Sequence, residues 1–183
     1  MWKLLLIFSV LPILAAMASR WWFGLRVLAD EGRRQCRCIA GKGPSPGDAD
    51  TEKSAAEFGR ELRLLALEEW RERDLKAANS RENSRRFGMA VPPMSGIIAI
   101  FAVIVGRVIP MGGFTIFASA TAISCAFGLL SLAPELRAIA VTARRFRTDK
   151  NFPRRDDEDA VVNCAIAHAW KETLPPVLSL IQK

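Results

Sequence analysis

The chain has 183 residues, of which 50% are hydrophobic, and its Lys and Arg residues exceed its Asp and Glu residues to give a formal charge of +7. One histidine and no tyrosine leave few side chains for acid–base catalysis. The arginines cluster at the ends of apolar runs, and no nucleic-acid-binding motif accompanies them. The composition therefore favours a membrane protein and argues against nucleic acid as a partner.

The first apolar run covers residues 4–19 and is followed by Arg-Trp-Trp at 20–22. Tryptophan is enriched where a membrane meets water, and an arginine there can extend its charge to the headgroups. We therefore interpret residues 1–28 as an N-terminal membrane anchor. The alternative is a cleaved signal peptide, because residues 16–18 have the small-x-small pattern of a cleavage site.

The segment 29–88 is predicted to be a hydrophilic loop that contains one helix. Its residues 40–50 are rich in Gly and Pro and predict a linker. Ser54 and Glu57 match a capping box, and strong helix formers follow, so we predict a helix over 54–78.

One side of this predicted helix is apolar at helical spacing. We predict that this side docks on a protein partner, and the alternatives are the C-terminal helix of the same chain or the membrane surface. Beyond the helix, the polar segment 79–86 is predicted to fray. The residues of the predicted docking face are Phe58, Leu62, Leu65 and Trp70.

Four cysteines are present, and only Cys36 and Cys38 lie close together in the sequence. A zinc site needs four ligands, so this isolated pair does not predict one. We interpret the two as surface thiols, with redox sensing or lipidation as the alternative. Cys125 and Cys164 lie in apolar segments and are predicted to be small buried hydrophobic residues.

Residues 89–134 contain a single charged residue, Arg107, beside the break that Pro110 begins. A soluble helix needs a polar face, whereas two apolar runs of about 20 residues suit a hydrocarbon core of about 30 Å. The segment is therefore predicted to be a transmembrane helical hairpin whose first helix begins at Pro92 and Pro93. Arg107 is predicted to lie near the outer interface.

Small residues recur along both hairpin helices. Such residues let transmembrane helices approach closely, so we predict packing between the two helices, with homo-oligomer formation as the alternative. The predicted packing residues are Gly96, Gly106, Ala118, Ala122 and Ala126.

Basic residues flank the apolar runs unevenly. Several arginines follow the first run and lie on both sides of the hairpin, whereas only Lys3 precedes the first run. Because basic residues concentrate on the cytoplasmic side, we predict a multi-pass protein of the cytoplasmic membrane with its N-terminus outside. The 29–88 loop and the 135–183 tail then face the cytoplasm.

The C-terminal tail is predicted to contain helices at 135–147 and 157–173, and a fourth span at 160–181 is disfavoured by its polar residues. His168 and Glu172 share a helical face, but two ligands are too few for a metal. We therefore predict a partly buried histidine and no catalytic, cofactor or metal site.

Four pieces of the chain, LPILAAMASR, RRFGMAVPPMSGIIAIFAVIVG, SLAPELRAIAVTARRF and DEDAVVNCAIAHAW, resemble the membrane-bound neutral zinc metallopeptidases often called YugP-like. The resemblance implies an anchor, a catalytic segment, a hairpin and an alanine-rich helix. The HExxH helix of that family would fall within 29–88, which contains no histidine, so no zinc ligand or general base carries over. The resemblance thus implies a catalytically inactive relative that binds or regulates a partner.

Together these predictions describe an all-α integral membrane protein with three transmembrane helices and short cytoplasmic helices. We predict a non-catalytic scaffold or regulator of a partner protein. One alternative is a divergent membrane zinc peptidase or a subunit of one, and another is a channel or transporter that would have to oligomerise to line a pore.

Overall fold

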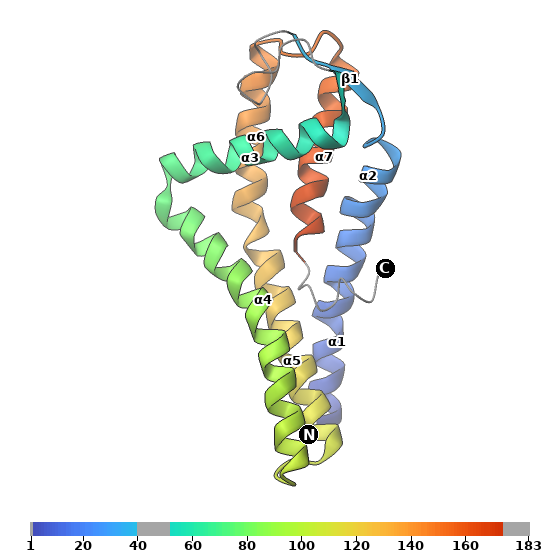
Figure 1. The fold of residues 1–183 in the computed structure, drawn as a ribbon, viewed down its shortest axis with the longest axis vertical. Coiled ribbons are helices and arrows are strands. Elements are labelled where there is room, and N and C mark those ends of the chain that lie inside the picture. Colours follow the sequence, from blue (N-terminus) through green and yellow to red (C-terminus); the bar gives the residue numbers. More distant parts are fainter. Residues whose placement is uncertain (1, 40–51, 174–183) are drawn as a thin grey trace. The chain divides into compact units, whose positions relative to one another are not determined.

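The computed structural model of the protein describes residues 2–39 and 52–173. These residues are mostly helical, which confirms the predicted all-α class (Figure 1). They form two compact units. The first, which we call the apolar unit, contains Ser80–Ser131 and the described parts of Met1–Ala18 and Thr173–Lys183, and the second, the polar unit, contains Ser19–Asn79 and Leu132–Glu172.

Within the described residues, three helices are long and apolar enough to cross a membrane. They are the continuous helical stretches Leu4–Asp30, Leu75–Ile104 and Pro110–Thr148. Three such helices agree with the number of spans predicted from the sequence. The elements of the apolar unit are α1 (Trp2–Ser19), α4 (Leu75–Ile104) and α5 (Pro110–Leu130).

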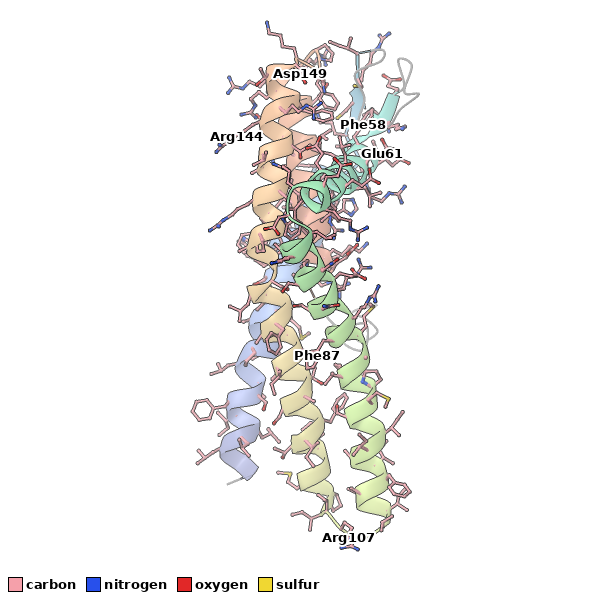
Figure 2. The ribbon with its side chains drawn as sticks, turned by 90° about the vertical axis from the view of Figure 1, so that its left-hand side faces the viewer. Phe58, Glu61, Phe87, Arg107, Arg144 and Asp149 are labelled. Atoms are coloured by element: carbon pink, nitrogen blue, oxygen red, sulfur yellow. The ribbon has the colours of Figure 1, made fainter. Side chains whose placement is uncertain are left out.

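The turn between α4 and α5 holds two residues of interest. Gly106 has a φ of 72°, a left-handed conformation that costs glycine little. Its predicted role in helix packing is therefore wrong, because it forms the turn instead. Arg107 is exposed at this turn (Figure 2), and Pro110 opens α5 at a position where its missing N–H does no harm.

The interior of the apolar unit is built from small residues. A Cβ added to Gly113 would lie 2.8 Å from Val103 Cγ2, and one added to Gly96 would lie 3.3 Å from the Phe117 ring. Of the other predicted packing residues, Ala118 and Ala122 are buried and Ala126 is half-buried. Close contact between α4 and α5 thus depends on small side chains, as expected inside a membrane.

Helix α4 begins earlier than predicted. It starts at Leu75, after Asp74 ends the preceding helix and accepts a hydrogen bond from Ala77 N–H at 3.0 Å. The polar segment 79–86, predicted to fray, is helical. Pro92 and Pro93 lie inside the helix rather than at its start. Neighbouring hydroxyls help transmembrane helices accommodate proline, and the Ser95 hydroxyl donates to the Pro92 carbonyl at 2.8 Å.

The polar unit contains the remaining elements, and α3 lies across α6 and α7 (Figure 1). The predicted helix at 54–78 ends at Arg73, while its predicted capping box is confirmed. The predicted linker at 40–50 lies outside the described residues. In chain order the elements are a π-helix η1 (Arg20–Leu25), α2 (Arg26–Asp30), β1 (Gln35–Arg37), β2 (Glu52–Ser54), α3 (Ala55–Arg73), α6 (Leu132–Thr148) and α7 (Arg155–Lys171).

In the structure, the predicted docking face of α3 packs against other helices of the same chain. Phe58 and Leu62 are 0% and 2% exposed, Trp70 is buried, and Leu65 packs partly buried against the same core. The core continues into α6 and α7, and Phe152 meets Phe58 edge to face at 5.6 Å. The predicted alternative, packing on helices of the same chain, therefore describes this face.

Strands β1 and β2 form a short antiparallel sheet that the sequence analysis did not predict, with Cys36 opposite Lys53. Alternate residues of a strand face the same side, so Cys36 and Cys38 both point inward. They are 0% and 2% exposed, and the prediction of surface thiols is wrong. Burial and the nearby Asp157 raise the pKa of the Cys36 thiol to about 11, which keeps it protonated and unreactive at neutral pH.

Candidate functional site

A buried arginine on α3 joins the three main helices of the polar unit. Arg63 is 6% exposed, and both its Nε and its Nη2 lie 2.8 Å from Glu135 Oε1 on α6. Its Nη1 and Nη2 lie 2.7 Å and 2.8 Å from the two carboxylate oxygens of Glu172, at the end of α7. One guanidinium therefore binds two carboxylates from two helices, using the fork geometry that lysine lacks.

Local structure positions each member of this Arg63 cluster. Arg63 follows Leu62 on the buried side of α3. Glu135 lies in the first turn of α6 and is 1% exposed. Glu172 is the residue that ends α7. The start of α6 and the end of α7 thus place Glu135 and Glu172 beside Arg63, which lies in the middle of α3.

The electrostatics of the cluster favour the fully charged state. Burial alone would lower the pKa of Arg63, but the hydrogen bonds that it donates to Glu172 and the charge of Glu135 outweigh burial and raise that pKa above its ordinary value. Removing Arg63 would take its positive charge away from the buried Glu135, and removing Glu135 would take a negative charge away from the buried Arg63. Either change is expected to be strongly destabilising. The Arg63 cluster therefore stabilises the packing of α3, α6 and α7 against one another.

The predicted pair of His168 and Glu172 does not form a metal site. Glu172 binds Arg63, whereas His168 Nε2 lies 3.0 Å from the carbonyl oxygen of Ala56. Burial lowers the pKa of His168, so the neutral ring donates this hydrogen bond. Among the described residues no group of three or more His, Cys, Asp and Glu side chains could hold a metal ion.

Further polar contacts join the same helices near the surface. Glu69 on α3 accepts hydrogen bonds at 2.9 Å from both Thr142 and Arg145 on α6. Arg147 on α6 donates to Glu158 on α7, also at 2.9 Å. Each pair of these helices is thus joined by polar contacts.

A connection also runs from α7 to the segment between α2 and β1. Arg34 binds Asp157 at 2.9 Å, and the Asn163 amide donates to the Glu31 carboxylate at 3.0 Å. Together with the buried Cys36, these contacts hold the end of the first membrane-length helix to the rest of the polar unit.

The sequence analysis missed Arg63 and Glu135, although both left a signal. Arg63 is a charged residue on the buried side of an amphipathic helix, and Glu135 is an acid directly after a long apolar run. A charge in either place needs a partner. Pairing two such residues far apart in the sequence requires the fold.

Comparison with known proteins adds no relative: no protein-family model matches the chain, and no curated protein or solved structure is similar to it.

Proposed function

We propose that this chain is a multi-pass protein of the cytoplasmic membrane whose polar unit serves a partner protein as a non-catalytic scaffold or regulator. The observation that carries the proposal is the Arg63 cluster. The charged groups of the cluster bind one another and so hold α3, α6 and α7 together. This arrangement favours a rigid binding surface over a catalytic site.

The arrangement of the polar unit also supports the proposed topology. Residues 55–73 lie between the first and second membrane-length helices, and residues 155–171 lie after the third. The two segments pack against each other with Gly59 so close to Cys164 that an added Cβ would lie 2.7 Å from Cys164 Cβ. Such contact supports a topology with both segments on one side of a membrane, and the flanking arginines favour the cytoplasmic side.

The outer face of α3 is the surface we propose for the partner. Its inner face is filled by α6 and α7, whereas Leu64 is 55% exposed among charged neighbours. A hydrophobic side chain surrounded by charges of both signs is the composition of a small protein contact. The residues of this outer face are Arg60, Leu64, Glu68 and Arg71.

Site-specific photo-cross-linking in native membranes tests the proposal. A benzophenone side chain at Leu64 should capture one discrete partner, whereas the same probe at Val141, an exposed apolar residue on α6, should not. Leu64→Asp should then weaken binding of the purified partner by about tenfold or more, as expected for a central interface residue. Equal capture at both positions, or unchanged binding by Leu64→Asp, would contradict the proposal.

Metal analysis of the purified protein separates this proposal from the alternative of a divergent zinc peptidase. Stoichiometric zinc, retained after dialysis, would favour the peptidase. Its absence together with partner capture at Leu64 would support the scaffold or regulator.

A further inference from the structure

A buried arginine at the start of the π-helix has two nitrogens without a hydrogen-bond partner among the described residues. Arg20 is 8% exposed, and within the described part of the chain its Nε and Nη1 are buried without a hydrogen-bond partner. Arginine stays charged at every pH at which proteins are folded. Unlike a buried lysine, it therefore cannot avoid the cost of its charge by losing a proton.

The contrast with Arg63 shows how unusual this is. Arg63 is equally buried, and two carboxylates surround its guanidinium. Arg20 carries the same guanidinium group, but its buried Nε and Nη1 have no hydrogen-bond acceptor among the described residues. A buried arginine with open donors points to an anionic ligand with two oxygen acceptors.

The position of Arg20 along the chain indicates what that anion is. It lies within the first membrane-length helix, Leu4–Asp30, directly after the apolar first part formed by α1. The next residues, Trp21 and Trp22, are exposed and lie with ring centroids 5.9 Å apart. Exposed tryptophans at the end of an apolar helix are typical of the membrane interface, where phospholipid phosphates lie.

The local backbone adds a second reason. Residues Arg20–Leu25 form a π-helix, a rare conformation that often occurs at functional sites. Within it, a Cβ added to Gly24 would lie 3.3 Å from the carbonyl oxygen of Ala167, so this segment packs tightly on α7. The backbone around Arg20 is thus held firmly, as a preorganised binding site requires.

We propose that Arg20 binds the phosphate of a membrane phospholipid through its Nε and Nη1. The headgroup phosphate supplies the two oxygen acceptors that the guanidinium fork needs, and the lipid reaches it at the depth that the tryptophans mark. A free phosphate ion offers the same oxygens from water. We assign the lipid because the residue lies within a membrane-length helix, beside the exposed tryptophans at the end of its apolar part. The proposal does not depend on the partner proposed above.

Thermal unfolding of delipidated protein in detergent tests this assignment. Phosphatidylglycerol should raise the melting temperature of the wild type, because a ligand that binds only the folded state stabilises it. Arg20→Met should lose most of that rise and bind the lipid about tenfold or more weakly, since the charge-assisted contacts are gone. Replacing an unpaired buried charge with an apolar side chain is tolerated, so this variant should fold.

Arg26→Met is the matched control, because Arg26 belongs to the same interfacial segment, is exposed, and lies 4.9 Å from the Trp22 ring and 3.7 Å from Asp30. It should keep the lipid-dependent rise. Arg20→Lys should fall between wild type and Arg20→Met, because it keeps the charge and loses the fork. An unchanged rise in Arg20→Met, or an equal rise with inorganic phosphate at matched concentration, would overturn the proposal.

Discussion

The polar unit has a core of large apolar side chains, whereas the apolar unit turns many of its largest apolar side chains outward. Phe58, Leu62 and Ile139 are almost fully buried in the polar unit. In the apolar unit Phe101 and Ile104 are 67% and 76% exposed. The two units of one chain therefore distribute residue size in opposite ways.

This difference indicates the solvent that suits each unit, which is water for the polar unit and lipid for the apolar unit. In water, burying large apolar side chains drives folding. In lipid that driving force is absent, and helices associate through close packing of small residues. The Gly113 contact with Val103 and the 3.0 Å contact between the hydroxyls of Ser9 and Ser119 are of this second kind.

The units also differ in how polar groups are used inside. The polar unit buries an ion cluster around Arg63. In the apolar unit the buried Arg81 donates to the Ser131 hydroxyl at 2.7 Å and to the Gly128 carbonyl at 3.3 Å. Changes at Arg63, Gly59 and Gly113 and a change of pH test whether the two units depend on ions and tight contacts in the ways that this comparison predicts.

The largest effect is expected at the cluster itself. Arg63→Ala should destabilise the polar unit by about 3–5 kcal/mol, because it removes the positive charge that a hydrogen bond and an ion pair bring to the buried Glu135 carboxylate. Chemical unfolding in detergent, followed by circular dichroism, measures this change. Arg145→Ala, which removes a surface contact to Glu69, is the control and should cost less than about 1 kcal/mol.

A double variant sharpens the same test. Arg63→Met together with Glu135→Met replaces the buried pair by apolar side chains, and the side chain of Glu172 is 40% exposed, so water can solvate it. Such replacements are often neutral, so stability should largely return. A loss in the double variant as large as in Arg63→Ala would show that packing, and not charge, governs this position.

The sequence predicted the helical class and the three membrane-length helices because apolar runs of that length leave few alternatives. It also predicted the start of α3, since Ser54 and Glu57 are a local signal. It failed where the outcome depends on distant residues. Cys36 looked exposed because the pairing of β1 with β2 bridges a long gap, and Phe58 looked available because its cover lies about a hundred residues further along the chain.

The next effect concerns close approach of helices. Gly59→Ala should destabilise the polar unit by about 1–3 kcal/mol, because its Cβ would lie 2.8 Å from the backbone nitrogen of Ala165 and 2.7 Å from Cys164 Cβ. Gly88→Ala is the matched control in α4: nothing lies within 4 Å of its added Cβ, so it should be neutral or stabilise by up to about 1 kcal/mol.

Gly113→Ala carries the same test into the apolar unit. Its Cβ would meet Val103 Cγ2, the end of a side chain, at 2.8 Å, and a side chain yields more easily than backbone. We therefore expect a smaller loss than for Gly59→Ala when both are measured by thermal unfolding. Equal losses would mean that the two units tolerate close contacts alike.

The smallest expected effect is a pH dependence from the one histidine of the chain, His168. Burial holds its pKa in the folded protein below the ordinary value of 6.5, so between these two values the unfolded chain binds more protons. Stability is therefore complete above pH 6.5 and falls as the pH drops below it, by at most about 1.4 kcal/mol per pH unit for one proton.

His168→Gln keeps a donor for the Ala56 carbonyl but does not titrate. Unfolding measured from pH 7.5 down to about 5.5 should slope in the wild type and be flatter in His168→Gln. Identical slopes would show that the pKa of His168 does not differ between the folded and unfolded states, which would contradict the prediction.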